Sequence, residues 1–178
     1  MEAYKLPHYT YEDYKTWKGD WELIEGIPYA FSPSPFWKHQ RLSLLIAMEL
    51  EKALEKCNEC FVCQEIDWII SYDTVVKPDI VVVCSKIDDY DHIKTTPSIV
   101  FEIVSKSTAI KDEKVKFEIY QKEGVKYYVL VYPEFEKIKI FELKNGKYEK
   151  IFEGKEGSFT FNIKCPVSIN FSNIWKKV

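Results

Sequence analysis

The sequence has no apolar run that approaches the roughly 20 residues needed to cross a bilayer. Its first residues, 1–5, also lack the basic and then apolar segments of a secretory signal. We therefore expect no membrane partner and a cytoplasmic location. The 178 residues, of which 46% are apolar, suffice for one globular core and contain neither repeats nor linkers, so we expect a single domain over residues 1–178.

Arginine is almost absent, because Arg41 is the only one and lysine supplies nearly all of the other positive charge. The guanidinium group is the side chain best suited to bidentate contacts with bases and phosphates. A basic excess is also lacking, since the formal net charge is −3 and the isoelectric point is near 5.7. These features argue mildly against a nucleic-acid-binding protein, although a local basic patch is compatible with an acidic total.

The cysteines form no evident disulfide framework, because there are five of them. Such usage fits a reducing compartment. Cys57, Cys60 and Cys63 have a spacing found in metal sites, but Cys84 and Cys165 lie far along the chain and no histidine is near. Because a tetrahedral site needs four ligands, we interpret these residues as core cysteines.

Apolar spacing predicts an α/β fold in which helices flank a mixed β-sheet. The clearest helix covers residues 37–56. A second covers 111–123 and ends at Gly124, in the position of a C-terminal capping glycine. A short third helix covers 10–17, where Thr10 and Asp13 form a capping pattern.

Runs of β-branched and aromatic residues predict the strands. They cover residues 21–26, 27–31, 61–70, 74–84, 98–105, 127–132, 137–143 and 147–152. Asn145-Gly146 is a hairpin turn signal between the last two, and the prolines of 32–35 predict a loop. Pro78 cannot donate to a ladder, so it predicts a bulge or a strand end.

Two carboxylates interrupt otherwise apolar strands: Asp79 in strand 74–84 and Glu102 in strand 98–105. A buried carboxylate without a partner costs on the order of several kcal/mol, so each needs a cation or several donors. If the strands are neighbours, the two charges repel each other, and a shared divalent ion removes both costs. Oxygen ligands favour Mg²⁺ or Mn²⁺. The alternative is that each carboxylate is a strand-end charge paired with a nearby lysine.

Asp112, Lys116 and Tyr120 recur every four residues and share one face of helix 111–123, beside its apolar stripe. Lys116 is therefore the helix lysine best placed to reach inward. The alternative is a surface ion pair between Asp112 and Lys116, worth about 0.3–0.5 kcal/mol. The opposite face carries a ladder that we expect to meet water: Lys114, Glu118 and Lys122.

The histidines and a short acidic segment are the remaining polar residues that could have a functional role. His39 begins the long helix beside the proline loop, where it could contact a phosphate or act as a polar cap. None of the histidines stands in a serine or cysteine motif of the triad type. Residues 88–91 contain three aspartates but lack the glycine and terminal glutamate of a calcium loop, so we interpret them as a solvated acidic loop.

An ordered set of short motifs over roughly residues 8–145 resembles the Uma-type family of restriction endonucleases, which belongs to the PD-(D/E)XK nuclease superfamily. Each motif is weak alone, and their order is more specific. The set comprises Glu25-Gly26, His39-Gln40, Pro78-Asp79, Glu102-Ile103-Val104-Ser105, Ser107-Thr108, Asp112, Lys116, Tyr120 and Gly124-Val125. The resemblance implies a restriction-endonuclease-like core.

The resemblance also implies roles for these residues. Asp79 and Glu102 would be metal ligands, with the main-chain carbonyl of Ile103 as a third, and a metal-activated water would attack a phosphodiester. The superfamily usually carries its lysine two positions after the glutamate, where this chain has Val104. Lys116 is our choice for that role and Lys106 is the nearest competitor. The accessory candidates are Glu25, His39, Asp112 and Tyr120.

We therefore expect a metal-dependent nuclease that acts on nucleic acid, with DNA as the first choice. A catalytically weak or inactive nucleic-acid-binding or assembly protein on the same fold is an alternative, favoured by the acidic isoelectric point and the displaced lysine. A hydrolase of nucleotides or other small molecules on the same site is another. A homodimer is a further expectation, because strand 137–143 would offer an edge.

Overall fold

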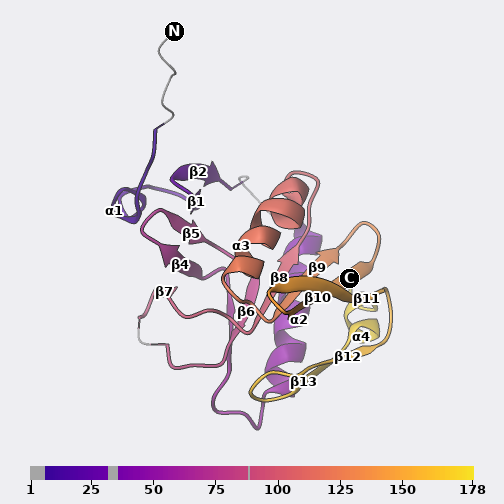
Figure 1. The fold of residues 1–178 in the computed structure, drawn as a ribbon. Helices are drawn as coiled ribbons and strands as arrows, with labels where there is room; N and C mark the ends of the chain where they lie inside the picture. Colours follow the sequence, from indigo (N-terminus) through magenta and orange to yellow (C-terminus); the bar gives the residue numbers. More distant parts are fainter. Residues whose placement is uncertain (1–6, 32–35, 88) are drawn as a thin grey trace.

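A six-stranded mixed sheet forms the centre of the computed structural model, which describes residues 7–31, 36–87 and 89–178 (Figure 1). Its strands are β3 (Phe61–Gln64), β6 (Ile80–Val83), β8 (Ile99–Ile103), β9 (Tyr127–Tyr132), β10 (Lys137–Lys144) and β11 (Lys147–Gly154). They lie in the order β11-β10-β9-β8-β6-β3. The central pair β8 and β9 is parallel, and the other neighbours are antiparallel.

Two smaller sheets accompany the central one. A five-stranded sheet has the order β2-β1-β5-β4-β7, and a hairpin of β12 and β13 forms the other. These strands are β1 (Trp21–Ile24), β2 (Ile27–Ala30), β4 (Asp67–Ser71), β5 (Thr74–Val76), β7 (His92–Ile93), β12 (Ser158–Phe161) and β13 (Val167–Asn170). The chain passes from the five-stranded sheet into the central one between β5 and β6, which places the two sheets side by side.

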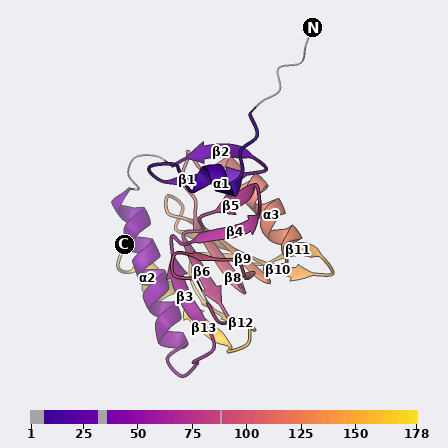
Figure 2. The same ribbon diagram turned by 90° about the vertical axis from the view of Figure 1, so that its left-hand side faces the viewer.

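Helices cover both faces of the central sheet. The helices of the described residues are α1 (Tyr11–Tyr14), which lies against β1 of the five-stranded sheet, α2 (Trp37–Ala53), the π-helix η1 (Lys111–Lys116), α3 (Phe117–Lys122) and α4 (Phe171–Trp175). Figure 2 shows α2 on one side of the sheet and α3 on the other. Within the described ranges, no helix is both long and apolar enough to cross a membrane.

Side-chain alternation along the central strands separates two apolar clusters. Ile80 of β6 and Phe101 of β8 belong to a cluster with Leu42 and Ile46 of α2. Their neighbours in sequence, such as Val81, point to the other side and join a cluster around α3. All four residues of β6 are buried, which confirms the prediction of a strand covered on both faces.

Two strand predictions were wrong in length, because each segment serves two sheets. Segment 61–70 divides into β3 and β4 at Glu65, whose φ of 50° is in the left-handed region. Segment 74–84 divides into β5 and β6 around Pro78, which confirms the predicted strand end. The break leaves Asp79 directly before β6 rather than inside a strand.

Local signals elsewhere were confirmed. The capping box of Thr10 and Asp13 begins α1, and Gly124 follows α3 with a φ of 81°. Asn145 and Gly146 both have positive φ in the β10–β11 turn, as a two-residue hairpin requires. The predicted edge was wrong, because β10 lies between β9 and β11. The proline loop at 32–35 and Asp88 lie outside the described residues.

The cysteines do lie in or against the apolar clusters, as predicted, but the expectation that they form no disulfide framework was wrong. The structure pairs Cys57 with Cys165 and Cys60 with Cys84, and leaves Cys63 free. The paired residues are 108 and 24 positions apart in the sequence. Spacing along the chain could not indicate this pairing, because the fold alone brings the distant segments together.

Candidate functional site

The ladder between β6 and β8 brings Asp79 and Glu102 together at one end of the two strands. Ile80 pairs with Phe101 across this ladder, and both side chains belong to the cluster on the α2 side. Glu102, which follows Phe101 in β8, therefore points toward the opposite side, where η1 and α3 lie. Asp79 lies at the end of the sheet, where its carboxylate meets both the amide of Ile103 and His39 of α2. The prediction that the two carboxylates come from neighbouring strands is confirmed, with Asp79 one residue before β6.

Asp79 is the partly exposed carboxylate of this pair, with 15% of its side chain accessible. Its Oδ2 accepts a hydrogen bond of 2.6 Å from the main-chain amide of Ile103, and its Oδ1 lies 3.1 Å from Nε2 of His39. Because Ile103 follows Glu102 directly, this bond holds the two carboxylates in one site.

Glu102 is buried, and two donors from the helical segment meet one of its oxygens. Oε1 accepts from Nζ of Lys116 at 2.9 Å and from the hydroxyl of Tyr120 at 2.7 Å. Burial raises the pKa of Glu102 well above its usual value, and the negative charge of Asp79 adds to this rise although Lys116 opposes it. Glu102 is therefore a carboxylate that needs additional positive charge to stay ionised.

Glu22 of β1 joins the cluster from the five-stranded sheet and is fully buried. Its Oε1 lies 2.6 Å from Nζ of Lys116 and accepts from the main-chain amide of Lys77 at 2.9 Å, while its Oε2 pairs with Lys111. Burial raises the pKa of Glu22, but the ammonium groups of Lys116 and Lys111 outweigh this and hold it below its usual value. Glu22 is thus an ionised carboxylate that forms ion pairs with both lysines.

Lys116 is 1% exposed and bridges Glu22 and Glu102. Burial lowers its pKa, but the surrounding carboxylates, Glu102 and Glu22 foremost, raise it well above the usual value. Lys116 is therefore a permanent cation and cannot serve as a general base.

Asp112 is the fourth carboxylate and is 3% exposed. Burial raises its pKa to about 6, although Lys116 and a hydrogen bond from Thr108 act in the opposite direction. The hydroxyl of Tyr128 donates to its main-chain oxygen at 2.9 Å, which fixes this turn of η1 against β9. Asp112, Lys116 and Tyr120 are all buried, so the predicted shared inward face is confirmed. The other face, Lys114, Glu118 and Lys122, is exposed as predicted.

The cluster contains more negative than positive charge. Four carboxylates, from Glu22, Asp79, Glu102 and Asp112, face the ammonium groups of Lys111 and Lys116. With all four carboxylates ionised and His39 neutral, the balance would be −2. This donor set fits a hard divalent cation, because such an ion would supply the missing charge and prefers carboxylate oxygens.

His39 links α2 to the cluster through its contact with Asp79. Burial lowers its pKa, but the hydrogen bond to Asp79 outweighs this and raises it above the usual value. Its other nitrogen, Nδ1, is buried and has no hydrogen-bond partner within the described part of the chain. His39 thus presents one nitrogen to Asp79 and keeps the other buried.

Two of the predicted residues lie outside this cluster. Lys106 has an 85% exposed side chain and pairs with Glu134, so it lies outside the cluster. Glu25 lies in the exposed turn between β1 and β2. The sequence signal for Glu22 was available, because an E-x-x-x-G spacing runs from Glu22 to Gly26 and not from Glu25. Lys111, the second cation, carried no distinguishing signal.

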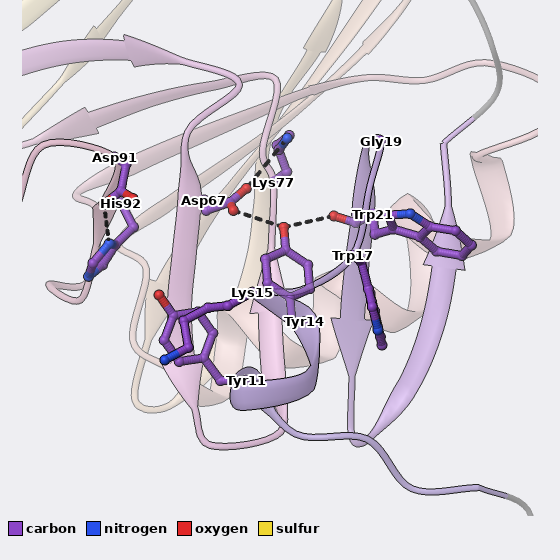
Figure 3. Close-up of a pocket in the computed structure, with 10 residues that line it drawn as sticks. All are labelled: Tyr11, Tyr14, Lys15, Trp17, Gly19, Trp21, Asp67, Lys77, Asp91 and His92. Atoms are coloured by element: carbon purple, nitrogen blue, oxygen red, sulfur yellow. Dashed lines mark hydrogen bonds and ion pairs between the residues drawn. The ribbon is translucent and has the colours of Figure 1, made fainter.

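A separate pocket of about 250 Å³ lies beside α1 (Figure 3). In it the hydroxyl of Tyr14 donates to Asp67 at 2.8 Å, and Lys77 lies 3.5 Å from the same carboxylate. Trp21 lines this pocket, whereas the next residue, Glu22, belongs to the charged cluster. Since successive strand residues point to opposite sides, the pocket and the cluster lie on opposite sides of β1.

Comparisons with known proteins identify the family and the fold. The sequence model of the Uma2 family, described as "Putative restriction endonuclease", matches residues 10–158. A crystal structure from Anabaena variabilis, described as a putative nuclease of the DUF820 family, shares the fold with a TM-score of 0.74. It is 16% identical in sequence, and the likeness covers 94% of this chain and 97% of that one. No curated protein matches the chain. Because the family match covers most of its length, the chain belongs to the Uma2 family of restriction-endonuclease-like proteins.

Proposed function

We propose that this protein is a nuclease that hydrolyses phosphodiester bonds of DNA with the help of Mg²⁺ or Mn²⁺. The observation that carries the proposal is the buried cluster in which two carboxylates from neighbouring strands share one site with an excess of negative charge. Membership of a family described as restriction endonucleases supports the nuclease reaction. The divalent ion and the DNA substrate are the parts that experiment must test.

The metal would be held by Asp79, Glu102 and the main-chain carbonyl of Ile103. Asp79 is the natural entry point, because its side chain reaches the surface whereas Glu102 is buried. When bound, the ion supplies an activated water and neutralises charge that develops on the phosphate. Its charge also removes the repulsion that raises the pKa of Glu102.

Lys116 provides fixed positive charge beside this position. Its ammonium lies 2.9 Å from Oε1 of Glu102, and its contact with Glu22 keeps it in place. We propose that it orients Glu102 and stabilises negative charge in the transition state. Tyr120, which donates to the same oxygen, positions Glu102 from the other side.

His39 and Lys111 form the accessible edge of the cluster, with 18% and 15% of their side chains exposed. We propose that Lys111 contacts the substrate phosphate, since its ammonium offers N–H donors. His39 holds Asp79 through Nε2 and its Nδ1 is buried, so we propose that it positions this carboxylate. Local positive charge at this edge would offset the acidic net charge of the whole chain.

The decisive experiment compares cleavage of supercoiled plasmid, single-stranded DNA, RNA and free nucleotides with Mg²⁺, with Mn²⁺ and with chelator. Wild type should cleave DNA only with a divalent ion. Asp79→Asn, which keeps the shape but not the charge of a ligand, should abolish cleavage. It should also remove the metal-induced stabilisation, which is a gain in the free energy of unfolding of about 2.7 kcal/mol when the free ion is at 100 times Kd.

Asp91→Asn is the matched control, because Asp91 is exposed and lines the pocket beside α1 instead of the cluster. It should leave both cleavage and metal stabilisation unchanged. Turnover of nucleotides without turnover of polymers would favour a small-molecule hydrolase. DNA binding without any cleavage would favour the inactive binding protein.

A further inference from the structure

Four of the five cysteines meet at the end of α2 opposite the candidate nuclease site. Cys57 follows α2, Cys60 precedes β3, Cys84 follows β6 and Cys165 lies between β12 and β13. The 17 residues of α2 span about 25 Å and separate this end from His39. Figure 2 shows the hairpin of β12 and β13 beside the same end of the helix.

The sulfur atoms form one cluster and not two distant bridges. Those of Cys57, Cys60 and Cys165 all lie within 4.8 Å of one another, and Cys84 is bonded to Cys60. Two disulfides that each stabilised a separate loop would not require their sulfur atoms to lie next to one another. A tetrahedral zinc ion with Zn–S bonds of about 2.3 Å holds its four sulfurs ~3.8 Å apart, so the sulfurs of each reduced bridge would move apart to reach this spacing.

We propose that Cys57, Cys60, Cys84 and Cys165 bind one zinc ion in their thiol state. The spacing of Cys57 and Cys60, with two residues between them, is typical of structural zinc sites, and the fold supplies the two further ligands. Binding releases the thiol protons, since thiolates are the ligands. The two disulfides are the oxidised form of this cluster. A dithiol reductant returns them to thiols, with two electrons and two protons for each S–S bond.

Contacts around the cluster hold its segments together without the sulfur bonds. Nζ of Lys164 lies 2.6 Å from Oε1 of Glu59, so the segment of Cys165 is tied to the loop between Cys57 and Cys60. A zinc ion with four thiolates carries a charge of −2, and lysines directly precede Cys57 and Cys165 in the sequence. A positive charge near a thiol favours its thiolate form, although the charge of Lys164 is paired with Glu59.

The cluster fits a closed structural site. Cys60 is buried and the other three cysteines are half-buried, so four protein ligands would leave no open position for a substrate. Cys165 lies beyond residues 10–158, which match the family. Zinc would therefore fasten the C-terminal hairpin of this chain to α2 and to the central sheet.

Zinc content and thiol counts of the full chain test the proposal. Protein made in a reducing cytoplasm and purified without chelator should contain one zinc per chain by mass spectrometry. After denaturation with chelator, all five cysteines should react as thiols. Cys165→Ser should lose most of the zinc, because three thiolates leave one position to water. Cys63→Ser is the matched control and should keep one zinc, since Cys63 is outside the cluster.

Several results would overturn the proposal. One reactive thiol and no zinc would mean that the disulfides are the working state. Five thiols that bind no zinc on reconstitution, or iron in place of zinc, would exclude the site equally. If Cys165→Ser does not fold, cobalt added to metal-free wild type should give the absorption of tetrahedral thiolate coordination, and its absence would exclude the site.

Discussion

The two faces of the central sheet are lined by alternate residues of the same strands, yet they bury different chemistry. On the α2 face, the side chains of β6 and β8 meet an apolar cluster that includes Leu42, Ile46 and Leu50. On the α3 face, similar apolar residues surround Glu102 and Lys116. A buried ion pair rarely stabilises a fold more than apolar residues of the same volume would. The charged face is therefore better explained by chemistry than by stability.

The largest effect should come from breaking the ion cluster. Glu22→Gln leaves Lys116 with one carboxylate fewer, so we expect the free energy of unfolding to fall by about 3–5 kcal/mol, as when one partner of a buried pair is removed. Denaturant unfolding measures it. Glu25→Gln on the adjoining exposed turn should change it by less than about 0.5 kcal/mol. Equal effects of the two variants would contradict the assignment of Glu22 to the cluster.

The next effect concerns turnover. Lys116→Ala should lower the cleavage rate by about 10²–10³, or 2.7–4 kcal/mol, as for the removal of one transition-state donor. Lys114→Ala, on the exposed side of the same helical segment, should leave the rate unchanged in single-turnover assays. Lys106→Ala tests the competing lysine. Loss of cleavage in Lys106→Ala with retention in Lys116→Ala would reverse the assignment.

The pH dependence should also distinguish the two faces. The pKa of Asp112 rises from 3.8 to about 6 on folding, so the folded chain binds more protons and its stability falls as pH rises through this window. Without metal, Asp112→Asn should match wild type near pH 4 and exceed it by up to about 3 kcal/mol at pH 8. Thermal melts with chelator measure this. Exposed Glu118→Gln should show the same dependence of stability on pH as wild type. If Asp112→Asn also shows the wild-type dependence, Asp112 is not its cause.

The smallest effect should come from the apolar face. Ile46→Val removes one buried methylene group from the α2 cluster, so we expect a loss of about 0.5–1.5 kcal/mol. This loss should be the same at pH 4 and pH 8 and with or without Mn²⁺, since no charge is near. A metal-dependent loss would show that the two faces are coupled.

Much of this fold could be predicted from local patterns in the sequence. The α2 periodicity, the Asn145-Gly146 turn and the glycine after α3 each depend on neighbouring residues alone, and each was confirmed. The split of segments 61–70 and 74–84 could not be predicted, because it depends on which sheet each half joins. The π-helix at 111–116 could not be predicted either, since its pattern of buried residues also fits an α-helix.

The site was partly predictable for a similar reason. Asp79 and Glu102 interrupt apolar runs, and Lys116 lies on an inward stripe, so each has a signal in its own segment. Glu22 and Lys111 enter the cluster from segments that are 89 positions apart in sequence. Only tertiary structure reveals that this lysine meets this glutamate. The proposed roles of all these residues stay predictions until the variants are measured.

The hydrogen bond from the amide of Ile103 to Asp79 has a consequence for communication within the protein. The donor belongs to the backbone of β8, which pairs with β9 through Ile103 and Val131. A ligand that draws the Asp79 oxygen away must weaken its bond to this amide, so occupancy of the site is transmitted into the sheet. Ligand binding at Asp79 should therefore change the NMR resonance of the Ile103 amide proton and its rate of exchange with solvent. Both changes would occur without a change in the overall shape of the protein.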